Sequence, residues 1–111
     1  MLELSPRQMK IVERLFGAGF RHMNIPVYEN ALCVRRGDCA AVLGSEKGGG
    51  LCLQAPPVWV VEGNLGARIR RGEREVFVWK KMELEATPAR NAELQTFERD
   101  LLRLLQEPSG S

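Results

Sequence analysis

The chain has 111 residues and a formal net charge of +2 at pH 7, with 44% hydrophobic and 27% charged residues. This composition is typical of a globular domain and argues against global disorder. No apolar run approaches the ~20 residues that span a bilayer, and the first residues lack the basic-then-apolar order of a signal peptide. We therefore expect a cytoplasmic protein without a membrane segment, with one domain over residues 1–107 and a flexible tail over residues 108–111.

A helix is predicted to begin near the N-terminus. Ser5 is a typical N-cap, Pro6 suits the first helical position, and Gln8 can return a capping-box hydrogen bond. The stop signal is the run of residues 17–19, Gly-Ala-Gly. Apolar side chains at helical spacing predict the buried face: Met9, Ile11, Val12, Leu15 and Phe16.

Two similar turn sequences, residues 34–38 and 69–73, each lie between apolar-rich segments and predict two β-hairpins. The first would pair residues 27–35 with residues 39–43. Because residues 39–43 are apolar at every position, we expect this strand in the sheet interior, covered on both faces.

The three cysteines have neither C-x-x-C spacing nor a histidine cluster. Buried thiols in a reducing compartment are the favoured interpretation. A three-residue loop at residues 35–37 would place Cys33 opposite Cys39, which permits a disulfide or two metal ligands. Only Cys52 and His22 are then left to complete a zinc site, so the sequence predicts no metal and no cofactor.

Residues 44–50 are predicted to form a loop, since their four glycines lack the G-x-x-x-x-G-K-[ST] order of a phosphate loop. Residues 51–53 and 58–62 are predicted strands, separated by the ladder-breaking pair Pro56-Pro57. In the second hairpin, a turn at Arg71-Gly72 would pair residues 65–70 with residues 73–81. It would also set Arg70 opposite Glu73 and Arg68 opposite Glu75, with a bulged turn as the alternative.

A second helix should begin at Thr87-Pro88 and end near Gln106. Its predicted buried face contains Leu94, Phe97, Leu101, Leu104 and Leu105. The predicted fold class is therefore α+β: a mostly antiparallel sheet of about five strands built from two β-hairpins, flanked by N-terminal and C-terminal amphipathic helices.

Catalytic signals are weak. His22 is the only histidine, and no G-x-S-x-G motif is present, so we expect no enzyme. The order of elements, with strands ending in Val78-Trp79-Lys80, is similar to that of PD-(D/E)-x-K nucleases. In this chain Val78 occupies the position of the metal-binding acid of the triplet, so the resemblance implies at most a degenerate nuclease-like fold.

Two sets of polar side chains are candidate binding residues. The polar residues at predicted strand ends are candidate ligand contacts, unless they satisfy neighbouring backbone groups: Glu29, Asn30, Glu62 and Asn64. The basic residues of the hairpins are candidate nucleic-acid contacts, unless they are solvated hairpin tips: Arg35, Arg36, Arg68, Arg70, Arg71, Arg74, Lys80 and Lys81.

The leading functional hypothesis is a small non-catalytic interaction or accessory module that forms a homodimer and binds a protein partner. Two helices are too few to bury both apolar faces of the strand at residues 39–43. The apolar surface that they leave exposed favours association with a second copy. Charge is also uneven: residues 31–81 hold nine basic and five acidic residues, whereas residues 82–111 hold three and six. Nucleic-acid binding through the basic hairpins is the alternative hypothesis.

Overall fold

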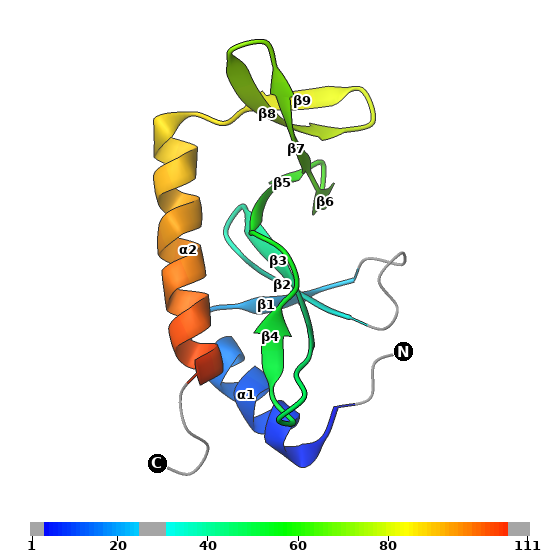
Figure 1. Ribbon diagram of the computed structural model, residues 1–111, viewed down its shortest axis with the longest axis vertical. Helices are drawn as coiled ribbons and strands as arrows, with labels where there is room; N and C mark the ends of the chain where they lie inside the picture. The colour runs from blue at the N-terminus through cyan, green and yellow to red at the C-terminus, as the bar shows by residue number, and fades with distance from the viewer. Residues whose placement is uncertain (1–3, 25–30, 107–111) are drawn as a thin grey trace.

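The computed structural model describes residues 4–24 and 31–106, and its fold is α+β, as predicted (Figure 1). Two helices flank a mostly antiparallel sheet, and the second hairpin belongs to a separate small sheet. The elements in chain order are α1 (Pro6–Gly17), β1 (Arg21–Met23), β2 (Leu32–Arg36), β3 (Cys39–Ser45), β4 (Leu51–Leu53), β5 (Val58–Val61), β6 (Asn64–Leu65), β7 (Ala67–Arg71), β8 (Arg74–Trp79), β9 (Met82–Glu85) and α2 (Pro88–Gln106). The predicted strand start at residue 27 and the predicted tail lie outside the described residues.

Helix α1 has the predicted capping box. Ser5 Oγ accepts a hydrogen bond from the Gln8 backbone N–H at 3.1 Å, and Gln8 Oε1 accepts one from the Ser5 N–H at 2.9 Å. The buried face differs from the prediction, because Met9 and Phe16 are 46% and 39% exposed. The amide of Gln8 donates to Ser45 Oγ and to the Gly50 carbonyl, which turns the Gln8 side of the helix toward the sheet. The buried residues are Gln8, Ile11, Val12 and Leu15.

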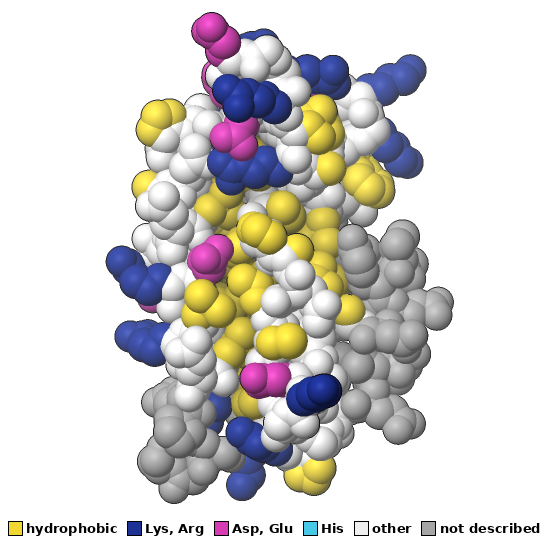
Figure 2. Space-filling model, viewed as in Figure 1, with side chains coloured by type: hydrophobic (Ala, Val, Ile, Leu, Met, Phe, Trp, Pro, Cys, Tyr) yellow, Lys and Arg dark blue, Asp and Glu magenta, His cyan; other side chains and the backbone are white. Residues whose placement is uncertain are grey.

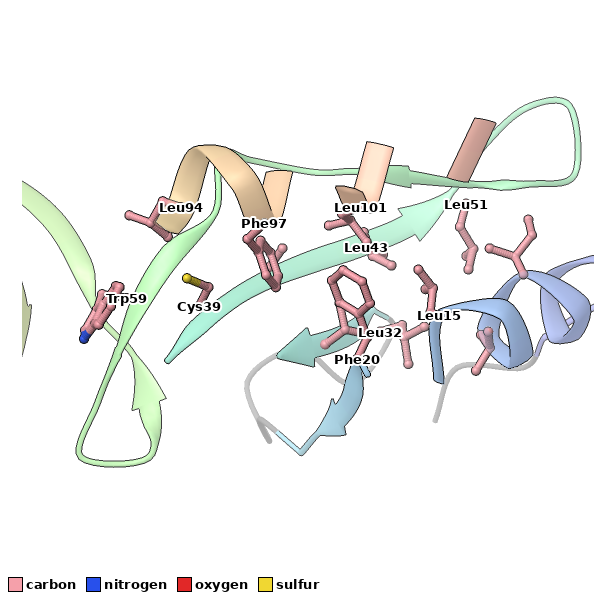
Figure 3. Packing of buried hydrophobic residues seen from close by; sticks show 14 of the residues in the cluster. Leu15, Phe20, Leu32, Cys39, Leu43, Leu51, Trp59, Leu94, Phe97 and Leu101 are labelled. Carbon is pink, nitrogen blue, oxygen red and sulfur yellow. The ribbon is translucent and has the colours of Figure 1, made fainter. Parts of the chain in front are cut away.

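Strand β3 lies at the centre of the larger sheet, whose order is β1-β2-β3-β5-β6. Strand β2 pairs with β3 along one edge, so β4 and β5 share the other edge of β3 at its two ends. The buried residues on the face beneath the helices, named cluster A, include Ala41. They also include Leu43, which is labelled in Figure 3. Cluster B, on the other face, contains Met23, Cys33, Ala40 and Val60. The prediction that β3 is buried on both faces is confirmed.

The predicted register of the first hairpin is wrong. Gly37 and Asp38 form a two-residue turn, and Arg36 pairs with Cys39. Gly37 takes a φ of 62°, the left-handed conformation that the first position of such a turn requires. Cys33 consequently lies opposite Val42, so Cys33 and Cys39 belong to clusters on opposite faces of the sheet, and both thiols are free.

The second hairpin is shifted for the same reason. Its turn is Gly72-Glu73, with Gly72 at a φ of 64° and Arg71 paired with Arg74. Neither the predicted turn at Arg71-Gly72 nor a bulge occurs. Leu65, in β6, pairs with Val60 of β5 rather than with β8. The predicted strand over residues 73–81 ends at Trp79 as β8, and residues 80 and 81 form the turn before β9.

Gly66 connects the two sheets. Its N–H donates to the Trp59 carbonyl at 3.0 Å, and a Cβ atom at this position would lie 2.8 Å from that oxygen and 2.8 Å from Val61 Cγ2. Only a residue without a side chain fits such a close approach, so this glycine allows the chain to pass from β6 to β7.

Helix α2 begins at Pro88 as predicted, with Thr87 Oγ1 accepting a hydrogen bond from the Arg90 N–H at 3.2 Å. Three of its side chains, Leu94, Phe97 and Leu101, are buried in cluster A (Figure 3). Phe97 packs on Phe20 with ring centroids 5.2 Å apart. In the described ranges, neither helix is long and apolar enough to cross a membrane.

Candidate functional site

The eight basic residues predicted to contact nucleic acid do not form one face. Arg36 lies between the sheet and α2: its Nη2 is 2.9 Å from Asp100 Oδ2, and its guanidinium stacks 4.6 Å from the centroid of the Phe20 ring. Arg35 donates to the Gly37 carbonyl at the tip of its own hairpin. These two arginines therefore hold α2 and a turn in place.

The other six basic residues belong to the small sheet, and two of them form ion pairs. Arg68 contacts Glu75 at 2.8 Å and Asn91 at 3.1 Å, and Arg71 contacts Glu83 at 2.6 Å. The hydrogen bond from Arg68 lowers the pKa of Glu75. The remaining exposed cations have no carboxylate within 4.0 Å in the described part of the chain: Arg70, Arg74, Lys80 and Lys81.

Glu62 and Asn64 belong to a tight turn between β5 and β6. Glu62 and Gly63 have φ values of 50° and 73°, and Asn64 Nδ2 donates to the Glu62 carbonyl at 2.9 Å. At Asn64 the structure supports the alternative that these side chains satisfy local backbone groups. Glu29 and Asn30 lie outside the described residues.

The surroundings of both buried thiols disfavour the thiolate form. Burial raises the pKa of Cys33, and burial followed by the nearby Glu93 carboxylate raises the pKa of Cys39 to about 11. A hollow of about 290 Å³ lies beside Cys39, between Arg36 and α2. Across residues 4–24 and 31–106, no three side chains of the metal-binding types gather into a cluster.

A larger groove, of about 870 Å³, runs between α2 and the Pro56-Pro57 segment. Figure 2 shows hydrophobic side chains gathered between the helix and the segment that contains β4 and β5. Apart from the buried Leu94, the side chains that line it on α2 lie outside the buried helix face: Asn91, Gln95, Glu98, Arg99, Leu102, Arg103 and Gln106. In the sequence, the corresponding signals are helix positions spaced three or four residues apart between Asn91 and Gln106, and the proline pair at residues 56–57. No local pattern places the two side by side.

Strand β4 pairs with β3 along one edge, and its other edge is covered at Leu51, which is only 2% exposed. The Gln54 N–H donates to Val42 O and the Glu46 N–H donates to Gly50 O, so the backbone groups of even-numbered residues face β3. Backbone groups alternate in an antiparallel strand, so the N–H and C=O groups of Leu51 and Leu53 face outward. No strand of the described chain pairs on that side of β4.

The charged side chains of the groove are mostly basic. Arg99 and Arg103 are exposed and lie one turn apart on α2, whereas Glu98 is half-buried. Arg68, at one end of the groove, is neutralised by Glu75. The hydrogen bond from Arg36 is the main cause of the lowered pKa of Asp100, and Arg103 and Arg99 add to it. The groove therefore offers positive charge to a ligand.

No family model matches the chain, and neither curated proteins nor solved structures include a match to it.

Proposed function

We propose that this protein is a non-catalytic interaction module that binds a segment of a partner protein in the groove beside α2. The observation that carries this proposal is the combination of an open groove of about 870 Å³ with an apolar lining from Pro56, Pro57, Leu94 and Leu102. Apolar grooves bind polypeptide segments in several kinds of recognition module.

The electrostatic properties of the chain support the same proposal. The two thiols with raised pKa values are buried, and the acidic side chains with lowered pKa values, Glu75 and Asp100, are hydrogen-bonded to arginines. Each perturbed group therefore has a structural explanation in packing or in an ion pair.

Selection of random peptides by phage display tests this proposal. Peptides enriched on the wild-type protein should lose affinity for Gln95→Trp, because the indole fills the groove from an exposed position on α2. Ala89→Trp is the matched control, since Ala89 is exposed on the same helix and does not line the groove. Absence of enriched peptides, or equal binding to the wild type and Gln95→Trp, would contradict the proposal.

We also propose that the module self-associates through the outer side of α1. Met9 and Phe16 are exposed apolar side chains seven residues apart, which places them on the same side of the helix. Sedimentation equilibrium should give a mass near twice 12.5 kDa for the wild type and 12.5 kDa for Met9→Lys/Phe16→Lys. A wild-type monomer at hundreds of micromolar, the range of weak dimers, would refute self-association.

Nucleic-acid binding by the small sheet is a second candidate function. It is favoured by the four exposed cations without a carboxylate partner in the described chain, Arg70, Arg74, Lys80 and Lys81. Anisotropy of labelled oligonucleotides at low salt should then show weak, salt-dependent binding that is lost when all four are changed to Ala. No anisotropy change at tens of micromolar protein would remove this candidate.

A further inference from the structure

We propose that the groove takes an amphipathic, acidic helix of a partner protein, which packs along α2. This inference rests on the proposed function and specifies the conformation, the length and the charge of the ligand. The evidence comes from the arrangement of the lining side chains on α2, from the backbone groups of the groove and from its charges.

The lining side chains of α2 form two neighbouring ridges. Residues four positions apart in a helix lie one above the other on its surface, and such rows are the ridges by which helices pack together. The first row begins at the buried helix face and contains Leu94, Glu98, Leu102 and Gln106. The second row, which is exposed from its second member onward, contains Asn91, Gln95, Arg99 and Arg103. Because these two rows account for every lining residue of α2, the space between them fits a ridge of side chains from another helix.

The backbone groups of the groove favour a ligand that satisfies its own hydrogen bonds. From Asn91 onward, the N–H groups of α2 donate to carbonyls one turn earlier in the helix. Pro56 and Pro57, which line the groove opposite α2, have no N–H to donate. Among the described lining residues, only Arg68 belongs to a strand. An extended chain therefore finds no ladder of donors here, whereas a helix bonds its own N–H and C=O groups internally.

The length of the groove determines the length of the ligand helix. The lining residues of α2 extend from Asn91 to Gln106, which is about 22 Å at the helical rise of 1.5 Å per residue. In Figure 1, α2 runs without a kink along the long axis of the molecule. A helix of about 15 residues, or about four turns, can therefore pack along the whole groove.

Charge complementarity favours carboxylates on the ligand. Arg99 and Arg103 lie one turn apart on the exposed row, and Glu98 is the only carboxylate among the described lining residues. Leu94 and Leu102 belong to the other row, so the apolar and the cationic side chains of α2 are separated across the groove. A helix with an apolar stripe and carboxylates along one side of that stripe matches this arrangement, and salt weakens the attraction.

A defined probe tests the inference: the capped, labelled peptide Ala-Leu-Glu-Ala-Ala-Leu-Glu-Ala-Leu-Glu-Ala-Gln-Leu-Glu-Ala. Its leucines form one stripe of a helix, and its glutamates follow one side of that stripe. We expect saturable binding to the wild-type protein by fluorescence anisotropy, and about tenfold lower affinity for Arg99→Glu/Arg103→Glu. Arg74→Glu/Lys81→Glu has the same net charge and changes exposed residues outside the groove, so its affinity should stay within about twofold of wild type.

An exchange of charge tests the acidic character of the ligand. A second probe has lysine in place of every glutamate. It should bind the wild-type protein more weakly than the first probe does, and should bind Arg99→Glu/Arg103→Glu more strongly than the first probe does. The same order of affinities in both proteins would contradict an acidic ligand.

A single proline tests the helical conformation of the ligand. A third probe has proline in place of the central alanine, which lies away from the leucine stripe, and its matched control has glutamine there. Because proline breaks a helix and glutamine does not, the proline probe should bind at least about tenfold more weakly, while the control binds like the first probe. Equal binding of the proline probe, or no saturable binding of the first probe up to about 1 mM, overturns the inference.

These outcomes are distinguishable from failure of the proposed function. If displayed peptides bind in a manner sensitive to Gln95→Trp and the helical probe does not bind, only the inference is wrong. If no displayed peptide binds and the probe also fails, both are wrong. A monomeric mass for Gln95→Trp, under conditions in which the wild type is a dimer, would make a second copy the occupant of the groove and would also overturn the inference.

Discussion

Substitution of Gly66 by alanine tests how the two sheets are joined. The added Cβ would lie 2.8 Å from the Trp59 carbonyl oxygen, 2.8 Å from Val61 Cγ2 and 3.1 Å from Phe77 Cβ. The first of these contacts is with backbone and the third is with a fully buried side chain, so neither can move easily.

The expected loss of stability follows from these contacts. Overpacking in a well-packed site costs about 1–3 kcal/mol. Removal of glycine from the unfolded chain offsets about 0.4–1 kcal/mol of that cost. We therefore expect Gly66→Ala to lower the free energy of unfolding by about 1–2 kcal/mol.

Urea unfolding, followed by circular dichroism, measures this difference through the transition midpoint. Gly48→Ala is the matched control, because no atom lies within 4 Å of its added Cβ and its φ is not positive. The control should keep or slightly increase the wild-type stability. A Gly66→Ala protein as stable as the control would refute the close approach at β6–β7.

Three further predictions concern the core, the thiols and one ion pair. Leu101→Asp should unfold the protein or leave it without a cooperative thermal transition, because it buries an unpaired carboxylate at a position that is 0% exposed. In native protein at pH 8, a thiol reagent should rapidly modify only Cys52, which is half-buried, whereas Cys33 and Cys39 are buried. The free energy of unfolding should fall as pH rises from 9 to about 11, because the fold favours the neutral thiol of Cys39. Asp100→Asn should reduce the loss of melting temperature on acidification, because the lowered pKa of Asp100 gives stability that is present above pH 3.8 and is lost as pH falls through the folded-state pKa.

Local signals in the sequence were sufficient to predict the helices and the fold class. Ser5, Pro6 and Gln8 act within one turn of chain, and Thr87-Pro88 works in the same way, so both helix starts were correctly placed. The apolar run of β3 identified a central strand because burial on both faces leaves no polar positions.

Register and helix orientation were not predictable from local patterns alone. Both hairpin turns start at their glycine, whereas the sequence predicted a three-residue loop at residues 35–37 and a turn at Arg71-Gly72. Arg68 still meets Glu75, but along a diagonal rather than directly opposite. The exposed side of α1 depends on contacts between Gln8 and residues about forty positions away, which no short-range pattern contains.

The candidate site illustrates the same limit. The sequence suggested a basic face that includes Arg36. In the structure, Arg36 donates a hydrogen bond to Asp100, which lies 64 residues further along the chain. The groove depends on the packing of α2 beside a proline pair more than thirty residues earlier in the chain, and this arrangement arises only when the whole chain is folded.

Backbone NMR spectra of the protein, with and without a saturating peptide from the phage selection, test the central claim most directly. Gln95, Arg99 and Arg103 are exposed and line the groove, whereas Arg74 and Lys81 are exposed residues outside it. We expect the peptide to shift the amide resonances of Gln95, Arg99 and Arg103, while those of Arg74 and Lys81 change little. Saturable peptide binding that leaves the amide resonances of the groove residues unchanged would contradict binding in the groove.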